Sequence, residues 1–239
     1  MSKEVADWYD EFTVRQIKMG INARNKRIQQ WLERFGLKKS DRVLEIGCGI
    51  GTQTQLLAEY LDSDTQITAL DISPKSIKVA KDRYKNYSGI KWIAADFVAH
   101  DMSEKFDVIL MPDVVEHIPV DQHRQLFKNV RKALKKEGFV LIHIPQPYYQ
   151  EWCLENRPEL MQVIDQPIYT DVLAQNVYSN DMYIRHLETY TIWQEQGDYQ
   201  AIILKPYRND ITYSEPPPTL MKKVQGKTKQ LMKKYGLRK

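Results

Sequence analysis

A glycine-rich turn near the start of the chain constrains the fold more than any other feature. It reads VLEIGCGIG over residues 43–51 and carries Gly47, Gly49 and Gly51. Apolar and β-branched residues over 42–46 predict a strand before the turn, and an apolar stripe over 53–61 predicts a helix after it. Glycine lets the backbone turn tightly and approach a ligand that faces the helix N-terminus. The turn therefore predicts an α/β fold with a ligand at the carboxyl end of the first strand.

The following sequence repeats this alternation of strand and helix. Strands are predicted at residues 66–71, 90–95, 106–111 and 139–144, and helices begin at Ser73-Pro74 and near Leu126. The almost wholly apolar run at 106–111 is typical of a strand buried on both faces. A hairpin is expected where 186–194 and 199–205 flank Gln196-Gly197-Asp198. Together these segments predict a Rossmann-like, doubly wound, mostly parallel sheet of seven strands with an antiparallel C-terminal hairpin.

The length of 239 residues suits one domain with appendages. We expect a helical N-terminal extension over residues 1–40 and the α/β domain over 41–206. Residues 146–185 show no clear period and form an insertion within that domain. Residues 207–239 form a tail with a triple proline linker at residues 216–218 and a basic amphipathic helix beyond it.

The net charge of +4 is unevenly distributed. Residues 207–239 carry a net +7, which leaves −3 for the rest of the chain. A nucleic-acid partner is therefore not expected. The tail suits weak contact with an anionic membrane surface, or packing on its own domain or on a second subunit of a homodimer.

Other features of the composition favour a cytoplasmic protein. No segment approaches the roughly 18 apolar residues that span a bilayer, and the N-terminal residues lack the apolar region of a secretory signal. The two cysteines, Cys48 and Cys153, imply no disulfide framework.

Two acidic residues follow the second and third predicted strands. Asp71 ends the second strand, where a carboxylate can accept both hydroxyls of a ribose. Asp96 ends the third strand beside Phe97, a pair that can hold an adenine amino group and cover its ring. Glu45, two residues before the first glycine, could brace the loop through backbone N–H groups or pair with an N-terminal cation.

The stretch from Glu45 to Gly51, the acid of ALDIS and the acid of AADF together resemble the class I S-adenosylmethionine-dependent methyltransferases. The resemblance covers roughly residues 40–145 and 186–205. It implies that S-adenosylmethionine is the cofactor, with its methionine part near the glycines, its ribose at Asp71 and its adenine at Asp96. The cofactor-binding residues that we expect are Glu45, Gly47, Cys48, Gly49, Gly51, Asp71, Ile72, Asp96, Phe97 and Met111. A nicotinamide-binding dehydrogenase fits less well, because its fingerprint needs Gly or Ala where Thr52 stands.

The segment MPDVVEHIP at residues 111–119 follows the fourth strand and resembles the Glu-His segment of small-molecule methyltransferases, including ubiquinone-biosynthesis O-methyltransferases. This resemblance indicates His117 and Glu116 as catalytic residues. A histidine with an ordinary pKa near 6.5 can take a proton from a hydroxyl nucleophile. Two alternatives remain open, that the segment only shapes the donor pocket and that Asp113, Glu116 and His117 bind a divalent metal. His143, near the end of the fifth strand, is a weaker candidate.

The sequence therefore predicts an O-methyltransferase acting on a small hydroxylated metabolite or sugar. An N-methyltransferase on the same fold and a non-catalytic donor-binding protein are the alternatives. The segment WYDEF…GINARN resembles the N-terminal segment of some bacterial small-molecule methyltransferases, which implies that residues 1–40 form a lid that includes Tyr9 and Arg24; ordinary packing and surface roles are the alternative. Residues 146–185 would bind the acceptor. Aromatic residues of that insertion could line the acceptor pocket or pack a small satellite core: Tyr148, Tyr149, Trp152, Tyr169, Tyr178 and Tyr183.

Overall fold

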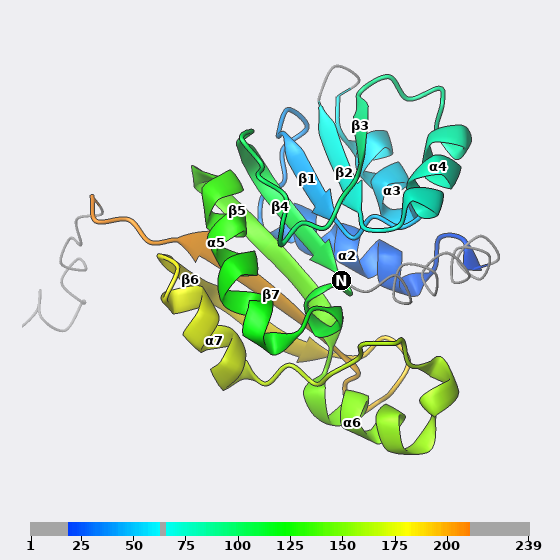
Figure 1. The fold of residues 1–239 in the computed structure, drawn as a ribbon, viewed down its shortest axis with the longest axis vertical. Coiled ribbons are helices and arrows are strands. Elements are labelled where there is room, and N and C mark those ends of the chain that lie inside the picture. The colour runs from blue at the N-terminus through cyan, green and yellow to red at the C-terminus, as the bar shows by residue number, and fades with distance from the viewer. Residues whose placement is uncertain (1–18, 63–65, 211–239) are drawn as a thin grey trace, which may run out of the picture. The chain divides into compact units, whose positions relative to one another are not determined.

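The computed structural model describes residues 19–62 and 66–210 (Figure 1). The chain divides into two units, Met1–Tyr207 and Arg208–Lys239, and only residues 208–210 of the second unit are described. The expected lid residue Tyr9 and the basic amphipathic helix both lie outside the described residues.

A seven-stranded sheet forms the centre of the first unit, as the sequence predicts. Its order is β3-β2-β1-β4-β5-β7-β6. The first five strands are parallel, and β7 runs antiparallel to both β5 and β6. The strands are β1 (Val43–Ile46), β2 (Ile67–Asp71), β3 (Ile90–Ala94), β4 (Phe106–Pro112), β5 (Leu134–Pro145), β6 (Met182–Tyr190) and β7 (Tyr199–Pro206).

Helices cover both faces of the sheet (Figure 1). They are α2 (Ala23–Arg34), α3 (Thr52–Tyr60), α4 (Pro74–Arg83), α5 (His123–Ala133), α6 (Pro147–Asn156) and α7 (Thr170–Tyr178), with short 3-10 helices η1 (Val115–His117), η2 (Val120–Gln122) and η3 (Pro158–Leu160). Successive residues of a strand point to opposite faces of the sheet, so β4 contributes side chains to the apolar core on each face. Ile109 packs in a core with α5 and α7, whereas Val108 packs in a core with α2 and α3.

The first helix that is described, α2, is fixed at both its start and its apolar face. The Asn22 side chain accepts the backbone N–H groups of Arg24 and Asn25, which caps the first turn. Ile28 and Leu32 are fully buried against the sheet. The cap and the buried apolar face together fix the first turn of α2 close to the glycine turn. There Asn25 Nδ2 donates to Gln53 Oε1 at 3.3 Å.

The structure differs from the sequence prediction in the last third of the domain. The residues 146–185 contain two helices, α6 and α7, and β6 begins at Met182 instead of residue 186. The strand β5 also begins earlier, at Leu134. In α6 the apolar and polar residues are spread around the whole helix, so no helical period is visible in the sequence.

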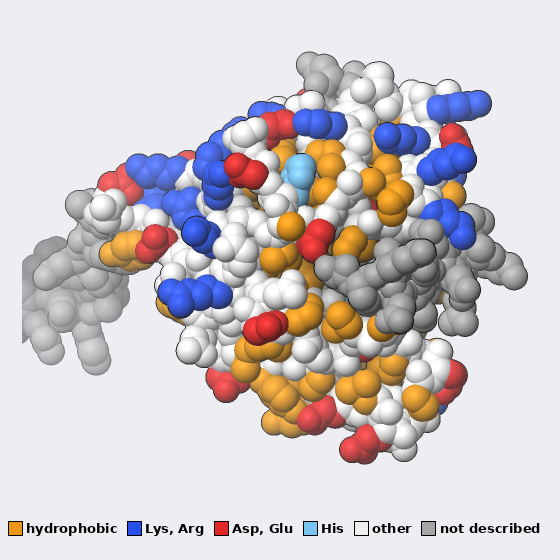
Figure 2. All heavy atoms as spheres, viewed as in Figure 1, with side chains coloured by type: hydrophobic (Ala, Val, Ile, Leu, Met, Phe, Trp, Pro, Cys, Tyr) orange, Lys and Arg blue, Asp and Glu red, His pale blue; other side chains and the backbone are white. Residues whose placement is uncertain are grey.

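Several large apolar side chains of α6 and the turn after it are exposed. Figure 2 shows hydrophobic side chains gathered over this part of the molecule, and Tyr148, Trp152 and Leu160 are each about half exposed or more. None of the helices in the described ranges is long and apolar enough to cross a membrane.

The strand order places a ligand-binding crevice at a defined position. The strand β1 has β2 on one side and β4 on the other, so the chain order reverses at the β1–β4 boundary. Open α/β sheets bind ligands outside the carboxyl ends of the strands at such a switch point.

Candidate active site

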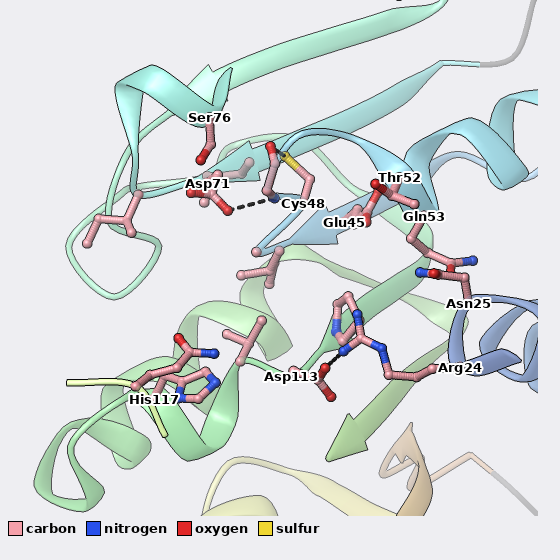
Figure 3. Close-up of a pocket in the computed structure, with 18 of the residues that line it drawn as sticks. Arg24, Asn25, Glu45, Cys48, Thr52, Gln53, Asp71, Ser76, Asp113 and His117 are labelled. Carbon is pink, nitrogen blue, oxygen red and sulfur yellow. Dashed lines mark hydrogen bonds and ion pairs between the residues drawn. The ribbon is translucent and has the colours of Figure 1, made fainter. Parts of the chain in front are cut away.

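A cavity of about 350 Å³ opens at this switch point, within the size range of small-molecule sites (Figure 3). It is lined from the carboxyl ends of β1, β2 and β4, the segment after β3, and the first turn of α2. Most of the residues expected to bind the cofactor line it: Glu45, Gly47, Cys48, Gly49, Asp71, Ile72, Asp96 and Phe97. Gly51 and Met111 do not, since Gly51 ends the turn as the N-cap of α3 and Met111 is fully buried in the core.

The glycine turn has a backbone that other residues would strain. Gly47, Gly49 and Gly51 have φ angles of 76°, 52° and 82°, in the left-handed region that favours glycine. A Cβ on Gly47 would collide with Val114, and a Cβ on Gly51 would lie 2.7 Å from ring atoms of both Trp92 and Tyr84. The turn is therefore packed so closely that only hydrogen atoms fit at these two positions.

Asp71 links the first two strands at the base of the cavity. Its Oδ2 accepts the backbone N–H of Gly49 at 2.7 Å, and its Oδ1 accepts that of Ser73 at 2.9 Å. Figure 3 shows the first of these bonds joining the end of β2 to the turn after β1. The carboxylate is nearly buried and lines the cavity, so the same group holds the turn and faces the ligand space.

Glu45 is fully buried and also lines the cavity. Its Oε2 accepts the hydroxyl of Thr54 at 2.6 Å, and this is the contact found in place of the backbone N–H groups or the cation expected from the sequence. Burial raises the pKa of Glu45 to about 8, against the opposing effect of the Thr54 hydrogen bond. Its Oε1 is buried and has no hydrogen-bond partner among the described residues.

Asp96 and Phe97 follow β3 at the other side of the cavity. The Oδ1 of Asp96 accepts the backbone N–H of Val98 at 2.9 Å, which fixes the carboxylate at the start of a tight turn. The Phe97 ring is almost fully buried in the core that includes Leu70.

The segment after β4 forms the opposite end of the cavity. Asp113 lies in the left-handed region with φ of 51°, and its carboxylate pairs with the guanidinium of Arg24 from α2 (Figure 3). Its Oδ1 also lies 3.6 Å from Nδ1 of His143. The His143 ring is fully buried and stacks on Tyr199, with ring centroids 4.7 Å apart. Burial first, and then the charge of Arg24, hold the pKa of His143 well below its ordinary value, so its ring is neutral.

His117 lines the same end of the cavity. Its Nδ1 lies 2.7 Å from the carbonyl oxygen of Ile164. A carbonyl only accepts, so the ring proton of neutral His117 sits on Nδ1 and the lone pair is on Nε2. Nε2 has no hydrogen-bond partner in the described part of the chain, and Oε1 of Glu116 lies 3.9 Å from it. Burial lowers the pKa of His117, and the nearby charge of Asp165 opposes this.

Glu116 does not line the cavity and lies behind His117 in the core. Neither of its carboxyl oxygens has a hydrogen-bond partner among the described residues. Burial is the main cause that raises its pKa to about 8, and Asp165 adds to the effect. Glu116 is therefore a neutral acid at neutral pH that does not face the cavity.

The described residues contain no group of three His, Cys, Asp or Glu side chains that could hold a metal ion. Within the segment after β4, Asp113 pairs with Arg24 while Glu116 is buried away from the cavity. The three side chains considered from the sequence thus do not converge on one point.

Comparisons with known proteins agree with this geometry. Residues 43–138 match a family described as a methyltransferase domain. The phosphoethanolamine N-methyltransferase 1 of Arabidopsis thaliana is 26% identical over 198 residues, which is 77% of this chain and 40% of that protein. The solved structure of the N-methyltransferase NodS from Bradyrhizobium japonicum WM9 in complex with S-adenosyl-L-homocysteine has a TM-score of 0.61 at 20% identity, over 77% of this chain and 85% of that one.

Over residues 43–138 the chain thus matches a methyltransferase domain, and its fold is that of solved S-adenosylmethionine-dependent methyltransferases. The solved S-adenosylmethionine-dependent methyltransferase from Clostridium acetobutylicum ATCC 824 has the same fold, with a TM-score of 0.65 at 15% identity over 80% of this chain and 95% of that one. The chain spans about a third of the length of the (S)-coclaurine N-methyltransferase of Thalictrum flavum (32%) and two fifths of the Arabidopsis relative (40%).

The cavity fits S-adenosylmethionine in its chemistry. Because the glycines of the turn have no side chains, their backbone forms part of the cavity wall. The carboxylates of Asp71 and Asp96 supply hydrogen-bond acceptors for hydroxyl and amino groups. Arg24 is the one Lys or Arg among the described lining residues, and its guanidinium is paired with Asp113.

Some lining residues were not found from the sequence. Gln162 comes from the insertion, and Trp193 and Tyr199 come from the loop and strand that follow β6. None of the six aromatic residues proposed for the insertion lines the cavity, and Tyr148 and Tyr178 are exposed. No periodicity or motif in the sequence indicates a role for Trp193, because a single tryptophan in a turn is indistinguishable from an ordinary surface residue.

Proposed function

We propose that the protein is a methyltransferase that moves the methyl group of S-adenosylmethionine to a small-molecule acceptor, with His117 as the general base. The observation that supports this most directly is that one cavity holds both the glycine turn with Asp71 and Asp96 and, at its other end, His117. The cofactor supplies a sulfonium methyl group that a nucleophile can displace in line. The residues of the chain therefore have to align the acceptor and receive its proton.

His117 is arranged for proton transfer in three respects. The carbonyl of Ile164 fixes the tautomer, so the basic Nε2 is unprotonated. The lowered pKa keeps the ring neutral at pH 7, which is the form that can accept a proton. The ring is nearly buried, which excludes water from the proton transfer. Glu116 is a positioning residue in this proposal, because it contacts His117 and not the cavity.

The nucleophile is proposed to be an oxygen or a nitrogen that loses a proton. The sequence favours an oxygen acceptor because a hydroxyl needs a base. The same base serves an ammonium group, which must also lose a proton before it can attack. The names of relatives include N-methyltransferases and a malonyl-[acyl-carrier protein] O-methyltransferase, so they support methyl transfer in general and leave both acceptors open.

Two measurements test the proposal. Calorimetry with S-adenosylhomocysteine should show binding to a single site, and no binding would refute the assignment of the cavity. Incubation with methyl-labelled S-adenosylmethionine and a metabolite extract should yield a labelled molecule heavier by one CH₂ group. Binding without any labelled product, with S-adenosylhomocysteine failing to accumulate, would favour the non-catalytic donor-binding alternative.

A further inference from the structure

The acceptor end of the cavity is closed by an ion pair between distant parts of the chain. Arg24 lies in the first turn of α2, Asp113 follows β4, and both side chains line the cavity (Figure 3). The two side chains are only 25% and 17% exposed, so the pair is substantially removed from water. A charge at such a position requires a partner of opposite charge, and here the partner is the chain's own guanidinium.

The carboxylate of Asp113 is only partly satisfied by this pair. Its Oδ1 is buried and has no hydrogen-bond partner among the described residues. The nearest ring nitrogen is Nδ1 of His143 at 3.6 Å, which is longer than a hydrogen bond and belongs to a neutral ring. Within the described part of the chain, Arg24 is thus the one positive charge that faces Asp113. An incoming cation could use both carboxylate oxygens once Arg24 turns away.

The backbone holds Asp113 rigidly in this position. Its N–H donates to the carbonyl of His143 at 2.8 Å, which continues the pairing of β4 with β5. Its φ of 51° is a conformation that aspartate tolerates but that few other residues adopt. Strained backbone conformations of this kind gather at ligand-binding positions.

Aromatic rings line the same end of the cavity. Trp193 and Tyr199 both reach the cavity wall, and their ring centroids lie 5.6 Å apart at 73°. Aromatic faces attract cations, most strongly the face of tryptophan. The combination of an anchored carboxylate and aromatic faces is suited to a positively charged nitrogen.

We infer that Asp113 recognises a positively charged nitrogen of the acceptor, and that Arg24 fills this site in its absence. The acceptor class is therefore a small molecule with an amine that is protonated at neutral pH. This inference rests on the proposed function, because it takes the end of the cavity near His117 as the acceptor site. It makes Arg24 an internal competitor of the acceptor, and this leads to opposite effects for two substitutions.

The test uses a pair of probes with the same shape and different charge, 2-phenylethylamine and 2-phenylethanol. Their binding to the full-length protein is measured by ligand-observed NMR titration, without cofactor. In Arg24→Gln the affinity for the amine should rise about tenfold, as expected when a competing charge-assisted contact is removed, while the affinity for the alcohol stays constant. Arg24→Lys keeps the competing charge and should bind both probes as the wild type does.

Asp113→Asn should have the opposite effect and abolish the preference for the amine. Asparagine is well suited to a positive φ, so this variant keeps the backbone conformation. Asp121→Asn removes an exposed carboxylate on η2 and serves as the matched control, with both affinities unchanged. The inference is overturned if Arg24→Gln leaves the amine affinity unchanged or if the amine preference survives Asp113→Asn.

Calorimetry with S-adenosylhomocysteine on the same wild-type preparation separates this inference from the proposed function. If S-adenosylhomocysteine binds and the amine shows neither effect, only the acceptor class is wrong. If S-adenosylhomocysteine does not bind, the proposed function itself fails.

Discussion

The substitution Asp71→Asn offers a quantitative test of how the cofactor end of the cavity works. In the structure the two carboxylate oxygens of Asp71 accept the N–H groups of Gly49 at 2.7 Å and Ser73 at 2.9 Å. Asparagine has one acceptor oxygen, so its amide NH₂ must face one of these two donors. The variant therefore loses one charge-assisted hydrogen bond, worth about 1.5–3 kcal/mol. For a chain of this size we expect Tm to fall by roughly 3–12 °C.

The same substitution should weaken cofactor binding. If Asp71 accepts the ribose hydroxyls, the affinity for S-adenosylhomocysteine falls roughly 10- to 100-fold, which corresponds to the same energy range. Calorimetry measures this directly. Asp82→Asn, which removes an exposed carboxylate on α4, is the matched control and should change neither Tm nor affinity.

A double-mutant cycle separates direct contact from an effect on the glycine turn. The second ligand is the 2′,3′-dideoxy analogue of S-adenosylhomocysteine, which lacks the hydroxyls. Direct contact predicts that Asp71→Asn weakens the parent ligand much more than the analogue, with a coupling energy above about 1 kcal/mol. Equal losses for both ligands would refute the contact and show that Asp71 acts only by holding the turn.

Three further predictions follow from the geometry. His117→Asn keeps a donor to the Ile164 carbonyl but no base, so turnover of an identified acceptor should fall about 10²- to 10⁴-fold with S-adenosylhomocysteine affinity retained; a near-normal rate would exclude the base role. Glu116 has a folded pKa of about 8, above its unfolded value, so its contribution to stability is full below about pH 4.5 and declines until about pH 8. Urea unfolding should therefore find Glu116→Gln more stable than the wild type at pH 8, and this gain should shrink at pH 5; a constant difference would contradict the raised pKa. Gly51→Ala adds a collision to backbone strain and should cost at least about 2 kcal/mol more than Gly36→Ala, where φ is 95° but no atom lies within 4 Å of the added Cβ; equal urea midpoints for the two variants would disprove the close packing.

The sequence predicted which residues lie at the cofactor end of the cavity because the strands of a parallel sheet end at the same edge. Glu45, Asp71 and Asp96 stand at or just beyond the ends of β1, β2 and β3, which are neighbours in the sheet. Parallel strands end at the same edge, so residues far apart in the chain meet there without any detail of packing. The local period of the strands and the glycine turn was enough to predict this arrangement.

The insertion was less predictable, for two physical reasons. The helix α6 carries apolar residues around its whole surface, and several of them are exposed, so no buried stripe marks it. The strand β6 is only partly buried along most of its length, because it lies at the edge of the sheet. Its first residues therefore lack the strict alternation that would have shown where it begins.

The acceptor end depends on contacts that no local pattern encodes. Asp198 appears in the sequence as an ordinary turn residue, yet it is fully buried and accepts the N–H groups of Ile192 at 2.7 Å and Trp193 at 2.9 Å. These bonds fold the loop before β7 inward, and Trp193 thereby reaches the cavity. Arg24 likewise reaches Asp113 only because α2 docks on the sheet through Ile28 and Leu32, which lie one and two turns further along the same side of the helix. A motif identifies residues that bind a shared cofactor, whereas the side chains that would choose the acceptor are brought in one at a time by tertiary packing.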